Sequence, residues 1–370
     1  MIFMTGGSGY LGSYVVEKLL REHTENLALL IRGKDERDVA VKLWESLQLH
    51  MDEATFKNYL QTRIKIFRGD LTEKKFGLSE HDWKMLTEQT QSIIHCAASL
   101  NRKSDKVCMN VNMRGTLQII QLARAAQDHH GLRRLSFVST VAVAGERQSE
   151  IVREDESVDW NRNDYDPYAR TKKFCEHMVT EMLPDVSTLI FRPSIILGDS
   201  RFARTSQFDM AQAFVWLAKL PVLPFDENWK LDIVPANFVG GAVADLHQKE
   251  KPNHRIYHLS SGEGSLTYAQ IVETLSKNGL GRPRFAMWLE PLFRGAINIA
   301  ASSPRRFGIS GAGMLLKVFF PYLTFNTVFD NKRVVDELGV RPAPFSDYAN
   351  PLYNFVTEND FKYPYKPIQF

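Results

Sequence analysis

The sequence predicts an α/β fold in which helices cover both faces of a parallel sheet, with a smaller C-terminal part attached. Three observations support this fold class. Short apolar runs alternate with helix-like stretches over the first 200 residues, the first run leads directly into a glycine-rich turn, and 370 residues exceed what a single small core needs. A content of 44% hydrophobic and 24% charged residues is typical of folded globular proteins.

The apolar runs of the N-terminal part have the length of strands, and amphipathic stretches separate them. Because each strand is followed by a helix-length crossover, the strands are expected to lie parallel in a doubly wound, Rossmann-type sheet spanning residues 1–193. The expected strands are 2–5, 26–31, 63–70, 91–98, 132–140 and 186–194, and the clearest helices are 10–22, 106–127 and 168–182.

The pattern loosens after Pro193, where we place a discontinuous substrate-binding region over residues 194–370. Residues 230–246 read as a strand running into a helix, and 255–277 as a strand, a turn and a helix whose N-cap lies near Ser265 or Thr267. Residues 283–327 are rich in aromatic residues, Leu, Met and Arg. We expect this segment to form a helical cap outside the sheet.

Charge and cysteine content exclude several classes of protein. A net charge of +3 is too small to indicate a nucleic-acid partner. Cys96, Cys108 and Cys175 are not spaced as metal ligands and are too few for a disulfide framework, so we expect no metal and a reducing, cytoplasmic location. No apolar run reaches the length of about 18 residues that predicts a membrane-spanning helix, and the N-terminus leaves no room for a signal peptide.

The glycine-rich turn predicts a dinucleotide site. Gly6, Gly9 and Gly12 stand between a strand and a helix, where the chain must turn sharply and approach a pyrophosphate closely. The free N–H groups at the helix N-terminus then face the phosphates. A glycine-rich turn without a ligand is the less favoured interpretation. Other residues expected to touch the cofactor are Thr5, Tyr10, Leu11, Asp70, Leu71, Ala97 and Pro193.

The residue after the second strand indicates which cofactor binds. An acidic residue near this point holds the ribose of NAD, but here Arg32 occupies the place and Lys34 follows. A guanidinium suits a 2′-phosphate, so NADP(H) is predicted as the cofactor. The alternative is that both are solvated loop charges, and Asp35 complicates the pattern.

A tyrosine and a lysine four residues apart form the candidate catalytic pair. Tyr168 and Lys172 share one face of a helix, and an ammonium beside a phenol lowers the phenol pKa. Tyr168 could then donate a proton to a carbonyl oxygen as hydride reaches the carbon. Ser139 and Thr140, at the end of the fifth strand, supply a hydroxyl for the developing oxyanion. Taken alone, this spacing also occurs in ordinary surface pairs.

The motifs TGGSGYLG, GDL, HCAAS, NVNMRGT, VST, YARTK, FRPSIILG and LDIVPANFV occur in this order. Together they resemble the extended short-chain dehydrogenase/reductase superfamily, from Thr5 to about Leu275. The resemblance implies that Thr140, rather than Ser139, acts with Tyr168 and Lys172. It also implies that Asn112 is the structural asparagine near the active site.

The segments GDLTEKKFGLS and PYLTFNTVFDN, with VST and Arg32, look most like the thioester reductase and fatty acyl reductase branch. This resemblance implies an NADPH-dependent reductase acting on a lipid-like carbonyl or an acyl thioester held on coenzyme A or a carrier protein. Sugar-nucleotide epimerases or dehydratases and hydroxysteroid-type dehydrogenases share the core motifs and remain alternatives. A non-catalytic nucleotide sensor is disfavoured because it needs no proton donor.

The apolar cap segment leaves three uses open. It could be plain core, or it could line the substrate cleft with Phe285, Trp288, Leu289, Phe293 and Ile297. It could also contact a membrane surface, since Arg294, Arg305, Arg306 and Lys317 lie among its apolar residues. The sequence gives no indication of the oligomeric state.

Overall fold

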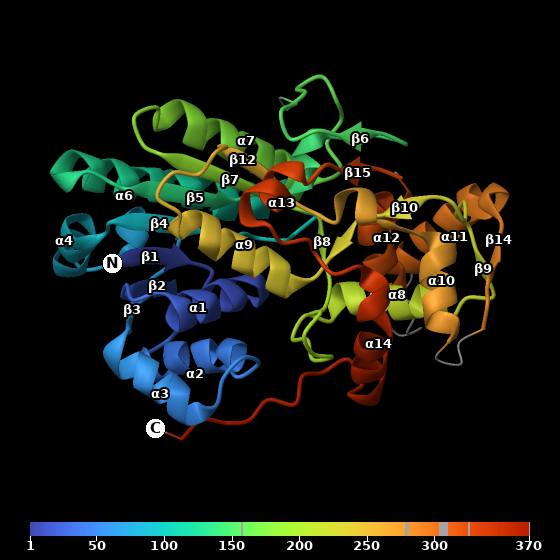
Figure 1. Ribbon diagram of the computed structural model, residues 1–370, viewed down its shortest axis with the longest axis horizontal. Helices are drawn as coiled ribbons and strands as arrows, with labels where there is room; N and C mark the ends of the chain where they lie inside the picture. The colour runs from blue at the N-terminus through green and yellow to red at the C-terminus, as the bar shows by residue number, and fades with distance from the viewer. Residues whose placement is uncertain (157, 278–280, 303–309, 325, 370) are drawn as a thin grey trace.

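The computed structural model describes residues 1–156, 158–277, 281–302, 310–324 and 326–369, and it has the predicted α/β architecture (Figure 1). Seven parallel strands form one sheet in the order β12-β7-β5-β4-β1-β2-β3. The strands are β1 (Ile2–Thr5), β2 (Leu27–Ile31), β3 (Ile64–Arg68), β4 (Ser92–His95), β5 (Arg134–Val138), β7 (Thr188–Pro193) and β12 (Ile256–Leu259).

Helices cover both faces of this sheet. Successive residues of a strand point to opposite faces, so in β1 the side chains of Ile2 and Met4 join one core cluster while Phe3 joins the other. The first face is covered by α1 (Tyr10–Glu22), α2 (Glu36–Leu47), α3 (Glu53–Thr62), α9 (Ala236–Gln248) and α13 (Lys332–Leu338). The second face is covered by α4 (Glu80–Gln89), α6 (Arg114–His130) and α7 (Pro167–Met182).

Several expected elements have other bounds than the sequence predicts. β4 ends at His95 and β5 at Val138, which leaves Ala97 and Thr140 in the loops at the carboxyl edge of the sheet. The helix expected at 106–127 is divided into α5 (Asp105–Cys108), a π-helical turn (Met109–Met113) and α6. Such a turn reorients side chains without breaking the helix, and here it contains Asn112.

The C-terminal half forms a third core beside the sheet, on the right of Figure 1. Five helices surround this core: α8 (Asp209–Ala218), α10 (Tyr268–Ser276), α11 (Glu290–Ser302), α12 (Ser310–Thr324) and α14 (Ala349–Glu358). Short strand pairs complete it, namely β8 (Ile195–Ile196) with β11 (Ile233–Val234), β9 (Val222–Leu223) with β14 (Arg284–Phe285), and β10 (Lys230–Leu231) with β13 (Leu266–Thr267). A further pair, β6 (Ile151–Val152) with β15 (Val328–Phe329), packs in a separate small cluster with Val141 and Ala144.

The expected cap is mostly helical, since α11 packs against α12, but its first residues form β14 rather than helix. Thr267 is the N-cap residue of α10, in a reciprocal capping arrangement with Gln270. The sheet takes its last strand, β12, from beyond Pro193, so the domain boundary at that residue stays a prediction. Arg305 and Arg306 lie outside the described residues.

Candidate active site

The glycine-rich turn has the geometry that a dinucleotide site needs. Gly6 has φ +78°, a conformation that L side chains rarely adopt. A Cβ on Gly6 would lie 2.6 Å from the backbone nitrogen of Ala97, and one on Gly12 would lie 1.9 Å from the carbonyl oxygen of Gly6. Both positions therefore require glycine. The turn leads directly into the N-terminus of α1, where N–H groups are free to meet phosphates.

Thr5 and Ala97 join the turn to the loop after β4. The Thr5 hydroxyl lies 2.7 Å from His95 Nδ1 and accepts a hydrogen bond from the Ala97 N–H at 3.3 Å. The other ring nitrogen of His95 lies 3.2 Å from the Thr116 hydroxyl, and burial lowers the pKa of His95 well below its usual value. His95 is thus a neutral residue that packs between Thr5 and Thr116.

Tyr10, Leu11 and Pro193, which were also expected to touch the cofactor, contact other parts of the fold. The Tyr10 hydroxyl donates to the carbonyl of Gly198 at 3.3 Å, and burial raises the pKa of Tyr10 to about 12. Leu11 packs against the first core cluster. Pro193 ends β7, beside Leu259 of β12. Direct contact of these three residues with a cofactor stays a prediction.

Arg32 and Asp70 meet at the edge of the sheet beyond β2 and β3. Arg32 Nη1 lies 3.7 Å from Asp70 Oδ2, and the Arg32 side chain is 81% exposed. Burial opposes ionisation of Asp70, but hydrogen bonds from Thr72 and the charge of Arg32 hold its pKa below the usual value. Asp35, which complicated the sequence pattern, caps α2 by accepting from the Asp38 N–H. Arg32 therefore remains available for an anion.

Lys34 and Leu71 take different positions near this edge. The Lys34 N–H donates to Asp38 Oδ2 at 2.8 Å, and its carbonyl accepts from Arg68 at 3.0 Å. Leu71 packs on α6 so closely that a Cβ on Gly115 would lie 2.6 Å from it. Lys34 is thus held by its backbone at the same edge as Arg32, and Leu71 packs beneath the loop after β3.

The predicted catalytic residues meet at the start of α7. Asp166 is its N-cap residue and accepts from the Ala169 N–H at 2.8 Å, with Pro167 at the first helical position. Tyr168 lies in the first turn of the helix and is buried. Thr140 follows β5, caps a 3-10 helix (Val141–Ala144) and acts to lower the pKa of Tyr168 through its hydroxyl.

The pKa of Tyr168 differs from the sequence expectation. Burial raises it to about 12, and the positive charge that most opposes this rise is Arg102 rather than Lys172. The Lys172 ammonium instead lies 4.1 Å from the centre of the Phe137 ring, and burial lowers the pKa of Lys172. The expected lowering by Lys172 is therefore wrong. A protonated phenol at neutral pH is nevertheless the state that a proton donor needs.

Asn112 links the loop after β4 to α7. Its Oδ1 accepts from the Ser99 N–H at 2.7 Å, and its Nδ2 donates to the Thr171 hydroxyl at 2.9 Å. Thr171 immediately precedes Lys172 in α7. This arrangement suits the structural role that the resemblance implies for Asn112.

Three residues of this region were assigned no role from the sequence: Asp166, Arg102 and Tyr322. Asp166 was recognisable, because an aspartate before a proline at a helix start is a capping signal. Arg102 lies in the loop after β4 and contacts Tyr322 of α12, 220 positions later in the chain. No periodicity or local motif links residues so far apart.

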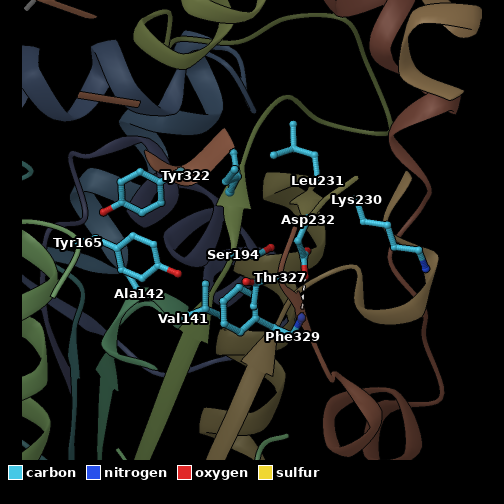
Figure 2. Close-up of a pocket in the computed structure, with 11 residues that line it drawn as sticks. Val141, Ala142, Tyr165, Ser194, Lys230, Leu231, Asp232, Tyr322, Thr327 and Phe329 are labelled. Atoms are coloured by element: carbon cyan, nitrogen blue, oxygen red, sulfur yellow. Dashed lines mark hydrogen bonds between the residues drawn. The ribbon is translucent and has the colours of Figure 1, made fainter. Parts of the chain in front are cut away.

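A pocket adjoins these residues (Figure 2). Val141 and Ala142, directly after Thr140, form part of its wall, and Ser194 follows Pro193. Figure 2 shows Tyr165 and Tyr322 on one side, with stacked rings 5.1 Å apart, and Asp232 on the other.

The five cap side chains expected to line the cleft do not line this pocket. Trp288 is 76% exposed, and Ile297 is buried in the third core. The cap contributes Tyr322 of α12 to this pocket, and a wall built from the first part of the cap stays one of the uses that the sequence leaves open.

Asp232 is the buried acid of the pocket. Its carboxylate accepts from the Ser261 N–H at 2.8 Å and from the Phe329 N–H at 3.3 Å, the second of which is drawn in Figure 2. Burial raises the pKa of Asp232 to about 6. Asp232 directly precedes β11, and its carboxylate links this strand to the loop after β12 and to β15. These hydrogen bonds hold the far wall of the pocket in place.

A family model described as male sterility protein matches residues 4–243, from the glycine-rich turn through most of α9. The chain belongs to this family. Membership of the male sterility protein family confirms the resemblance to the reductase branch of the extended short-chain dehydrogenases/reductases, and with it an NAD(P)-dependent oxidoreductase.

Individual relatives are distant. Nonribosomal peptide synthetase asaC of Aspergillus flavus is 28% identical over 272 residues, 70% of this chain but 26% of its own length. Putative fatty acyl-CoA reductase CG8306 of Drosophila melanogaster is 28% identical over 310 residues, 70% of this chain and 58% of its own. The chain thus spans less than two thirds of either relative.

The fold is shared with a solved structure. The crystal structure of the terminal R domain from the myxalamid PKS-NRPS biosynthetic pathway covers 97% of this chain and 91% of its own, with 23% identity and a TM-score of 0.84. Within the described part of this family member, no helix is long and apolar enough to cross a membrane. The same residues contain no group of three or more His, Cys, Asp and Glu able to hold a metal ion.

Proposed function

We propose that this protein uses NADPH to reduce a lipid-like acyl thioester, carried on coenzyme A or a carrier protein, with Tyr168 as the proton donor. The observation that carries the proposal is a buried Tyr168 beside Thr140, at the same sheet edge as a glycine turn that admits no Cβ. The pocket adjoining Thr140, with apolar residues in its wall, supports an acyl group as the substrate.

NADPH would supply a hydride to the thioester carbonyl carbon. The developing oxyanion would lie within reach of the Thr140 and Tyr168 hydroxyls, and Tyr168 would give its proton to that oxygen as the C–H bond forms. The product of this step is a thiohemiacetal, whose C–S bond then breaks to yield aldehyde and free thiol. The apolar side chains of Val141, Ala142 and Leu231 suit an acyl chain in the pocket.

NADPH oxidation with a series of acyl-coenzyme A substrates, from short to long, tests the substrate class. Each CH₂ buried in the pocket contributes up to about 0.8 kcal/mol, so kcat/KM should rise several-fold per added pair of methylenes until the pocket is full. A sugar nucleotide and a hydroxysteroid serve as controls. A flat chain-length response contradicts the lipid-like substrate, and turnover of the sugar nucleotide alone moves the protein to the epimerase branch.

We further propose that the protein is cytoplasmic and rests on an anionic membrane surface through α11 and the turn before it. Trp288, Leu292 and Ile299, spaced along one side of this segment, are 76%, 68% and 74% exposed, while Ile297 on the opposite side is buried. Exposed Arg282 and Arg284 precede this stripe. Large apolar side chains beside basic ones suit the interface of an anionic bilayer.

Sedimentation with lipid vesicles tests this contact. The parent should bind vesicles containing phosphatidylserine and bind phosphatidylcholine vesicles weakly, and a Trp288→Ser/Leu292→Ser variant should lose most of this binding. Val340→Ser is the matched control, because Val340 is also exposed, at 55%, but lies outside α11. Equal vesicle binding by the parent and the double variant would exclude a membrane as the partner of this apolar surface. So would a dimer of the parent that the double variant abolishes.

A further inference from the structure

Arg102 places a buried positive charge where three parts of the fold meet. It lies in the loop between β4 and α5, and its side chain is 16% exposed. Its Nε lies 3.2 Å from Asp166 Oδ2 and 3.4 Å from the Tyr322 hydroxyl, which accepts a hydrogen bond from it. Arg102 thereby joins the loop after β4 to the start of α7 and to α12.

The guanidinium also packs against aromatic rings of two helices. Its central carbon lies 5.4 Å from the ring centre of Tyr168 in α7, and 5.1 Å and 5.0 Å from those of Phe319 and Tyr322 in α12. A planar guanidinium can stack on rings and pair with a carboxylate at the same time, which an ammonium cannot do as well.

Asp166 closes the arrangement. One of its oxygens caps α7 through the Ala169 N–H, and the other accepts from the Tyr322 hydroxyl at 2.6 Å while pairing with Arg102. One carboxylate therefore orients the helix that carries Tyr168 and also holds the cap helix α12. Movement of α12 away from the site would break both contacts with Tyr322.

We propose that Arg102 is a positioning residue that couples docking of the cap helix α12 to proton donation by Tyr168. The cation beside the phenol stabilises the phenolate that remains when Tyr168 gives up its proton, and this effect is full only while α12 and Asp166 hold the guanidinium in place. The inference rests on the proposed role of Tyr168, but not on the identity of the carbonyl substrate.

The electrostatic environment of Tyr168 agrees with this role. Burial raises the Tyr168 pKa, Arg102 is the largest influence that lowers it, and Asp166 and Cys96 act in the opposite direction to Arg102. The charges facing Tyr168 are thus a paired Arg102 and Asp166, and any change in their geometry changes the acidity of the donor.

The test compares Arg102→Met, Arg102→Lys and the control Arg170→Met, whose parent side chain is 48% exposed and paired with Asp105 and Asp164 on the surface. We expect Arg102→Met to lower kcat about tenfold, the equivalent of one pKa unit in the donor, with unchanged NADPH affinity. Arg102→Lys should lose less, because it keeps the charge but not the stacking, and Arg170→Met should match the parent.

A phenol of lower pKa at position 168 distinguishes an electrostatic effect of Arg102 on the proton donor from a purely structural role of Arg102. Replacing Tyr168 by a ring-fluorinated tyrosine should restore several-fold of the lost kcat in the Arg102→Met background, and in Arg102→Lys if the first variant does not fold. An unchanged kcat in Arg102→Met, or a loss that the fluorinated tyrosine does not recover, overturns the proposal. If the parent reduces another carbonyl but no acyl thioester, the proposed function fails, and the same comparison is made with that carbonyl.

Discussion

Tyr168→Phe is expected to lower kcat by about 10²–10⁴-fold, the usual contribution of a positioned acid, while NADPH still binds. The substitution keeps the ring that packs under Arg102 and removes only the hydroxyl beside Thr140. Because burial raises the pKa of this hydroxyl to about 12, the parent enzyme holds the proton throughout the neutral range. Single-turnover oxidation of NADPH measures the chemical step, and fluorescence titration measures cofactor binding.

Tyr353→Phe, in α14, is the matched control and should leave kcat within about twofold of the parent, as expected for a change away from the reacting atoms. A Tyr168→Phe enzyme that keeps most of its activity on the natural substrate would show that the proton comes from elsewhere. Loss of NADPH binding in the same variant would instead indicate a damaged site.

Arg32→Ala is expected to weaken NADPH binding by about 1.5–3 kcal/mol, or about 10–150-fold, the range for hydrogen bonds to charged groups, and to leave NADH binding nearly unchanged. The Arg32 side chain is 81% exposed and its pairing with Asp70, at 3.7 Å, is long, so a 2′-phosphate can engage it at little cost. Fluorescence titration of parent and variant with both cofactors gives the four dissociation constants.

Arg37→Ala provides the control for this charge change. Arg37 is exposed in the first turn of α2, and its substitution removes the same positive charge from the same region. It should alter NADPH affinity far less than Arg32→Ala. Equal affinity of the parent for NADPH and NADH would contradict the assignment of Arg32 to the phosphate.

Local sequence was sufficient wherever the physical constraint is local. The glycine turn is recognisable because no side chain fits at Gly6 or Gly12, and α7 begins at Pro167, within one residue of the predicted start, because Asp166 caps it and Pro167 suits the first helical position. Alternation of strands and helices likewise predicted the parallel sheet, since each strand is joined to the next by a crossover that returns the chain.

Only the tertiary structure determined which distant groups meet. Arg102, Asp166 and Tyr322 come together because the Tyr322 side chain of α12 reaches the N-cap of α7, and nothing in their spacing predicts it. Composition identified the apolar cap but left open which of its side chains are covered, and the structure shows Trp288 exposed and Ile297 buried. The ammonium of Lys172 lies against Phe137, and the cation that most lowers the pKa of Tyr168 is Arg102. Local conformation follows from neighbouring residues, whereas burial and charge depend on every element packed around a group.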